Sequence, residues 1–181
     1  AETVDYNEPV FEGLGEPNGT GTVVVTGTGS QWDAGSLLAV GSWGTGEISI
    51  RNGGQVSAGT VIIGGGMVQL EEGQEFTEDL VPDGTGMITV TGSGSRLDAT
   101  GEDTLFVGYS SDGVLDVNEG GLVTSGSMIV GAAPDVIGTV TVHDTGSLVA
   151  VEDEVLIGAW GEGHLTIYDG SEVQTRNLVV G

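Results

Sequence analysis

Gly138-Thr139-Val140-Thr141-Val142 is one copy of a unit in which a glycine precedes two aliphatic residues in alternate positions. Alternation with a period of two predicts a β-strand with one buried face. Six copies occur, and their first glycines are 25, 40, 27, 25 and 25 residues apart. These glycines are Gly21, Gly46, Gly86, Gly113, Gly138 and Gly163. A repeat of this length, built from short strands and turns, predicts a solenoid.

Each unit continues in the same way. A turn rich in glycine, asparagine and aspartate comes first, and such residues readily take the positive φ of a tight corner. A second apolar position follows, and the unit closes with aliphatic-x-aliphatic-Gly, as in residues 155–158. The second apolar positions are Trp32, Val56, Leu97, Val123, Leu148 and Val173. We therefore expect an all-β fold, a single-stranded parallel β-helix of about six coils over residues 19–181, with right-handed winding as the default for parallel strands.

Two segments depart from the repeat. Residues 1–18 form an N-terminal extension, whose apolar residues predict either a cap on the first coil or contact with a neighbouring molecule. An acidic insertion at about residues 65–83 interrupts the second coil. Insertions in solenoids emerge as loops on one face.

The charge balance restricts the possible partners. The chain has 27 acidic and 3 basic residues, a net charge of −24. Such a field repels phosphate backbones and anionic membranes, so we expect no nucleic-acid partner. No apolar run approaches the roughly 20 residues that span a bilayer, so we expect no membrane insertion. The absence of cysteine excludes disulfides and thiolate metal sites. The start at Ala1 favours a processed, secreted or cell-surface protein.

The ends of the repeat array suggest self-assembly. The sixth unit runs to Gly181 without a polar capping unit, which predicts an open coil. Stacking of this coil on the N-terminal end of another copy would be a head-to-tail contact that builds filaments. A fragment of a longer solenoid is the alternative. The residues expected at these ends are Val4, Tyr6, Val10, Phe11, Leu165, Ile167, Val173, Leu178 and Val180.

Residue chemistry favours a protein without catalytic residues. The three arginines do not converge, and His143 and His164 occupy different positions within the repeat unit. A lyase or hydrolase that acts on polysaccharides is therefore a distant alternative. No cofactor is required, although carboxylates could bind calcium. The candidates are Glu71, Glu72, Glu75, Glu78, Asp79, Asp83, Asp98, Glu102, Asp103 and Asp112. Trp43, Tyr109 and Trp160 follow a coil-closing glycine, where aromatic rings either contact glycans or shield a turn.

The units at residues 19–32 and 46–56 resemble the passenger repeats of bacterial autotransporters and related surface adhesins, and a more degenerate form of the pattern covers residues 19–181. The resemblance implies an extracellular bacterial β-solenoid with a role in adhesion, biofilm or surface fibres. It supplies no catalytic residues. The sequence thus favours a secreted structural subunit that stacks into an extracellular filament or matrix fibre. The alternative is an adhesin passenger fragment that binds surface or host glycans.

Overall fold

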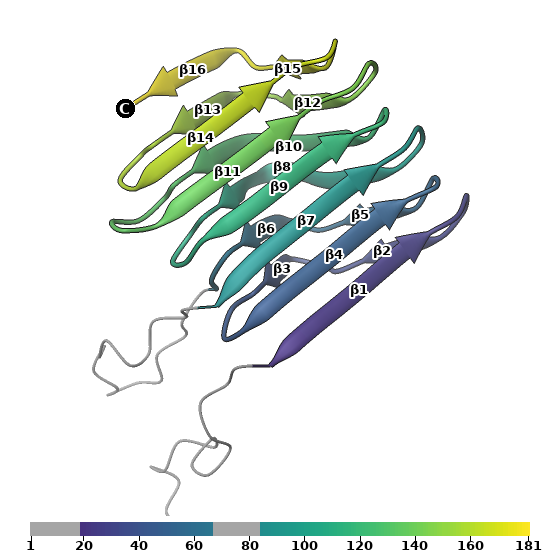
Figure 1. The fold of residues 1–181 in the computed structure, drawn as a ribbon, viewed down its shortest axis with the longest axis horizontal. Helices are drawn as coiled ribbons and strands as arrows, with labels where there is room; N and C mark the ends of the chain where they lie inside the picture. Colours follow the sequence, from purple (N-terminus) through teal and green to yellow (C-terminus); the bar gives the residue numbers. More distant parts are fainter. Residues whose placement is uncertain (1–18, 67–83) are drawn as a thin grey trace, which may run out of the picture.

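Figure 1 shows a stack of parallel strands that rises from β1 at one end to β14, β15 and β16 at the other. The structure, a computed structural model, describes residues 19–66 and 84–181, with the backbone alone for residues 100–103. Within these ranges the chain forms strands and turns and no helix. The strands wind into six coils spaced about 25 residues apart, apart from the insertion in the second coil. The predicted β-solenoid is confirmed.

The first strand of every coil belongs to one six-stranded sheet, in the order β1-β4-β7-β9-β11-β14. Its strands are β1 (Thr20–Thr26), β4 (Thr45–Arg51), β7 (Thr85–Thr91), β9 (Gly113–Asn118), β11 (Ile137–Val142) and β14 (Glu162–Ile167). All five neighbouring pairs are parallel and in register, so the six repeat glycines lie in one row.

The second and third strands of the coils form a larger sheet opposite the first. In coils three and four the two strands are continuous, as β8 (Arg96–Val107) and β10 (Leu122–Val130). The separate second strands are β2 (Gln31–Asp33), β5 (Gln55–Ser57), β12 (Leu148–Val151) and β15 (Glu172–Gln174). The separate third strands are β3 (Leu37–Val40), β6 (Thr60–Ile63), β13 (Glu154–Ile157) and β16 (Asn177–Val180).

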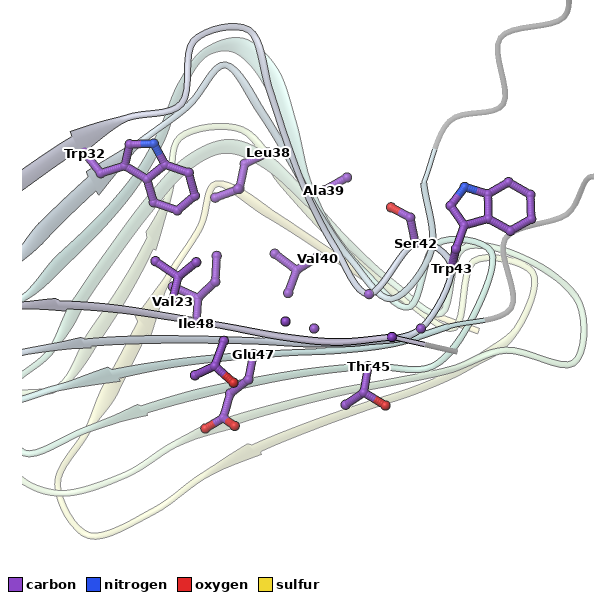
Figure 2. A pocket seen from close by; sticks show the side chains of 16 residues that line it. Val23, Trp32, Leu38, Ala39, Val40, Ser42, Trp43, Thr45, Glu47 and Ile48 are labelled. Atoms are coloured by element: carbon purple, nitrogen blue, oxygen red, sulfur yellow. The ribbon is translucent and has the colours of Figure 1, made fainter. Parts of the chain in front are cut away.

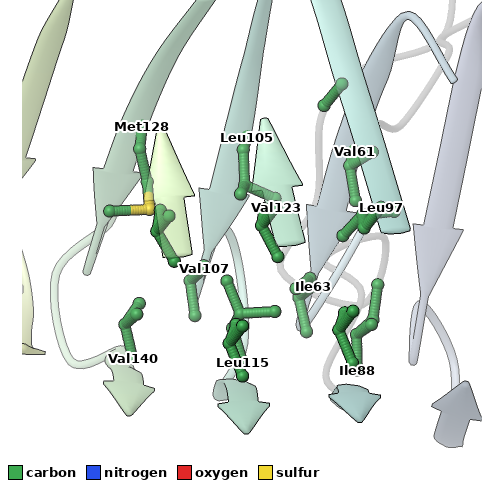
Figure 3. Packing of buried hydrophobic residues seen from close by; sticks show 14 of the residues in the cluster. Val61, Ile63, Ile88, Leu97, Leu105, Val107, Leu115, Val123, Met128 and Val140 are labelled. Atoms are coloured by element: carbon green, nitrogen blue, oxygen red, sulfur yellow. The ribbon is translucent and has the colours of Figure 1, made fainter. Parts of the chain in front are cut away.

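Alternate residues of all three strands point inward and stack in columns along the axis, as Figure 3 shows. Ile88, Leu115 and Val140 form one such column, and all three side chains are fully buried. Each buried aliphatic side chain of this kind stabilises the fold by about 1.5–3 kcal/mol. The core therefore runs through the coils without a break.

One predicted core position is wrong by a single residue. Leu148 was expected to point inward, but its neighbour Val149 is the fully buried residue and pairs with Val123 of the preceding coil. Leu148 pairs with Leu122 on the outer face. Because side chains alternate between the two faces of a strand, a one-residue error exchanges the inner and outer faces.

Buried serines tie neighbouring coils together at the turn after the first strand. Ser95 Oγ accepts a hydrogen bond from the Gly53 N–H at 3.0 Å and donates one to the Thr91 carbonyl at 2.7 Å. Ser147 Oγ accepts one from the Gly120 N–H at 3.0 Å. The same turn also contains residues with positive φ, including Asn52 and Asp144 at 53° and 67°. The predicted use of such residues at the corners is confirmed.

Ser125 is the weak point of the core. Its side chain is fully buried beside Ala99 and Val151, and its hydroxyl has no hydrogen-bond partner among the described residues. A buried hydroxyl without a partner costs about 1–3 kcal/mol. We expect Ser125→Ala to raise the urea unfolding midpoint, with Ser127→Ala, an outward-facing change on the same strand, as the control. A lower midpoint for Ser125→Ala would contradict the assignment.

Candidate functional site: the two end faces and the aromatic corner

The C-terminal end of the solenoid presents core positions to solvent. In the last coil Ile167, Leu178 and Val180 are 46%, 56% and 71% exposed. The matching residues one coil earlier, such as Val142 and Val155, are fully buried. The smaller exposure of Leu165 and Val173 follows from their packing against the core. The structure thus places all five predicted C-terminal residues on one open face.

The N-terminal end has a hollow of about 490 Å³. Figure 2 shows that Val23, Trp32, Leu38 and Val40 of the first coil and Ile48 of the second point toward one another, while Trp43 and Glu47 point away from this group. Val23 is 38% exposed there, although its ladder partner Ile48 is buried. The apolar side chains lining the hollow are Val23, Trp32, Leu38, Ala39, Val40, Trp43 and Ile48. Sequence reasoning assigned such positions to the core and missed the hollow, because the same pattern in a central coil is covered on both sides.

The predicted N-terminal contact residues Val4, Tyr6, Val10 and Phe11 lie outside the described residues. The insertion is also largely outside them. Gly65 still belongs to the regular coil, because its N–H donates to the Gly41 carbonyl at 3.1 Å.

The three predicted aromatic contact residues do not form one cluster. Trp43 and Trp160 occupy the same place in coils one and five, within the shared pattern Gly-x-Trp-Gly-x-Gly, and are 39% and 71% exposed. Four coil spacings separate them, roughly 19 Å. Tyr109 lies one position earlier in its turn, and its ring packs edge-on against Phe106 with centroids 4.9 Å apart. Trp43 also lines the N-terminal hollow, whereas Trp160 faces solvent.

Two of the predicted calcium ligands have structural roles. Asp98 forms an ion pair with Arg96 at 2.7 Å, and Thr124 of the next coil donates to the same carboxylate at 2.8 Å. Asp112 Oδ1 accepts the Ile137 N–H at 2.8 Å, which ties two coils together. In the described ranges no three histidine or acidic side chains gather closely enough to hold a metal ion. The predicted ligands outside the described side chains are Glu71, Glu72, Glu75, Glu78, Asp79, Asp83, Glu102 and Asp103.

A polar stack on the outer edge of coils four to six was not predicted. His143 lies between two carboxylates, with Nε2 3.1 Å from Asp116 and Nδ1 3.0 Å from Asp144. Its ring is parallel to that of Tyr168, with centroids 5.1 Å apart. The repeat already places His143 and Tyr168 at the same outward-facing position of neighbouring coils. The contact of His143 with Asp116 could not be predicted in this way, because it depends on the register between coils.

The basic residues are distributed over separate coils. Arg51 ends β4 in the first sheet, whereas Arg96 begins β8 in the second. Arg176 pairs with Asp153 at 2.7 Å in the last two coils. His164 pairs with Glu162 at 2.9 Å on an exposed surface, away from any described arginine pair. Arg96 and His164 thus pair with acidic residues of their own strands, whereas the Arg176 pair joins two coils.

These features define a β-solenoid whose first and last described coils expose apolar core positions and whose exterior is polar and acidic. No helix of the described part has the length and apolar character required to cross a membrane. The chain matches no protein-family model and no solved structure.

Similarity to known proteins comes from three bacterial sequences. The adhesin BmaC autotransporter of Brucella suis biovar 1 (strain 1330) is 32% identical over 120 residues, 64% of this chain and 3% of that protein. The uncharacterized lipoprotein YdeK of Escherichia coli (strain K12) is 29% identical over 179 residues, 75% of this chain and 14% of YdeK. The uncharacterized protein YuaQ of the same strain is 32% identical over 103 residues, 51% of this chain and 6% of YuaQ. The chain thus spans a small part of each relative, and its predicted resemblance to autotransporter adhesin repeats is confirmed.

Proposed function

We propose that this chain is a structural, non-enzymatic β-solenoid of an adhesin-like protein at the bacterial cell surface or outside the cell. The continuous core of in-register coils carries the proposal, because it makes a stiff rod. Among the described residues, polar side chains such as Asp98, Asp112 and Thr124 form hydrogen bonds that hold neighbouring coils together. Similarity to an adhesin autotransporter and to a lipoprotein supports the surface location.

We further propose that the rod extends by stacking end to end into an extracellular filament or matrix fibre. Both ends present apolar core positions, the hollow at the first coil and Ile167, Leu178 and Val180 at the last. Burial of these side chains favours contact with a further coil. The proposed contact joins the first coil of one copy to the last coil of another, so it is head-to-tail and leaves a free end after each addition.

Electron microscopy of the purified chain tests this function. One molecule of six coils is roughly 29 Å long. We expect filaments of constant width and much greater length at high protein concentration, because each added copy buries two apolar faces. Val180→Asp should leave single particles, since it places a charge on the stacking face. Ser49→Asp, an outward change whose strand partners Val24 and Thr89 are uncharged, should still form filaments.

Calcium is the second variable in this experiment. Samples with added calcium and with chelator show whether the acidic residues outside the described structure affect assembly. Single particles of the unmodified chain under both conditions would overturn end-to-end stacking.

The exposure of Trp160 favours a second function, glycan binding by an adhesin segment. An indole on a solvent-facing turn offers an apolar surface with a polar N–H, which suits the face of a sugar ring. A glycan array probed with the purified chain distinguishes the two functions, because we expect no glycan binding by a purely structural rod.

A further inference from the structure

Among the described residues, nothing requires glycine at two positions beside the N-terminal hollow. A Cβ at Gly21 or Gly19 would meet no described atom within 4 Å, and neither residue has a left-handed φ. The equivalent glycine in each later coil is different. A Cβ on Gly46 would overlap the backbone of Gly41 in the preceding coil, and one on Gly44 would overlap Gly19. Glycines at these places are therefore required where another coil lies against them.

The last coil of the same chain has the form that the hollow would accept. All coils share one register, so each residue of β14, β15 and β16 has an equivalent in β1, β2 and β3. Superposing that register on two copies places apolar residues of the last coil against apolar residues of the first. The resulting pairs are Leu165 with Val23, Ile167 with Val25, Val173 with Trp32, Leu178 with Leu38, and Val180 with Val40.

The same register also separates the acidic residues of the two faces. Glu162 would lie opposite Thr20, and Glu172 opposite Gln31. Asp33 of the first coil would face Gln174. Like charges directly opposite one another destabilise strand pairs. No acidic residue on the strands of one face meets an acidic residue on the strands of the other, although each copy has a net charge of −24.

We propose that the N-terminal hollow receives the last coil of a second copy, with strands parallel and Thr166 beside Val24. The proposal rests on end-to-end stacking and specifies its partner and register. Gly21 would then approach Gly181 of the neighbouring copy, as Gly163 approaches Gly158 within one molecule.

Disulfide trapping tests the register. The chain has no native cysteine, so every disulfide must join introduced cysteines. Val24→Cys and Thr166→Cys are combined in one chain. Adjacent parallel strands are about 4.8 Å apart, within the Cα separation that a disulfide spans. Within one molecule these residues are in the first and last coils, so their disulfide must join two copies. Mild oxidation is expected to give a ladder of linked oligomers on a non-reducing gel.

Thr26→Cys with His164→Cys is the matched control. These residues lie on the same outward face of the same strands, but in the proposed register they are four residues apart, about 13 Å along the strand. The control pair should remain monomeric. Thr22→Cys with His164→Cys probes the proposed register at a second place, in case the first double variant fails to fold.

The outcomes distinguish this register from stacking itself. Monomers from both in-register pairs, or equal linkage in the control pair, would overturn the register. If filaments still form in that case, the proposed register is wrong but the proposal of end-to-end stacking is retained. Absence of both filaments and linkage overturns both. As a further check, Gly21→Ala should reduce linkage of the Val24–Thr166 pair, because its methyl group would overlap the incoming coil.

Discussion

Gly113→Ala is expected to destabilise the protein strongly, by roughly 3 kcal/mol or more, in the upper range of overpacking. Gly113 begins the first strand of the fourth coil, and a Cβ there would overlap the Ile63 carbonyl oxygen and the Gly108 nitrogen. Those two atoms are joined by a hydrogen bond of 2.7 Å between coils. The backbone cannot retreat without breaking that bond. Chemical denaturation followed by circular dichroism measures the loss.

Gly21→Ala is the matched control, because it changes the same residue of the repeat in a coil with open space beside it. Its free energy of unfolding should change by about 0.5 kcal/mol or less, as for ordinary surface substitutions. If the two variants lost the same free energy of unfolding, contact with the neighbouring coil would not be the reason for glycine at these positions.

Leu115→Ala is expected to lower the free energy of unfolding by about 2–5 kcal/mol. Leu115 is fully buried in a central coil, with Ile88 on one side and Val140 on the other. Hydrogen bonds between strands fix the spacing of the coils, so the cavity left by the side chain cannot close by collapse. We therefore expect a value in the upper part of the range, measured from the denaturation midpoint.

Val114→Ala provides the comparison, because the adjacent side chain of the same strand faces outward and is half-buried. We expect it to cost about 1 kcal/mol or less. Similar costs for the two variants would mean that the inward and outward faces of β9 have been exchanged. In a solenoid each coil contacts only its neighbours, so damage to this central coil also separates the two halves of the core.

The fold could be predicted because each coil restates the same local pattern. The row from Gly21 to Gly163 marks the start of every first strand, and alternation identifies the inward residues next to it. The prediction failed at Leu148, where residues 148–151 are all apolar and alternation allows two phases. Pairing with Val123 selects Val149. That choice depends on the neighbouring coil, which lies 26 residues away in sequence.

The candidate site could be predicted less completely. The repeat pattern placed apolar positions such as Leu178 and Val180 in the last coil, and both side chains are exposed there. The roles of Asp98 and Asp112 did not, because their partners Thr124 and Ile137 come from the next coil. Likewise, a one-residue difference in turn position turned Tyr109 toward Phe106 and left Trp160 in solvent.

The common register of the coils has a consequence for the reach of the molecule. A segment such as residues 138–162 enters and leaves its coil at the same point as its neighbours, so its duplication or loss would preserve every column of the core. The length of the solenoid can then change in steps of one coil, roughly 4.8 Å each, and every added coil repeats the existing core contacts. The length of such a rod is therefore set by the number of coils encoded.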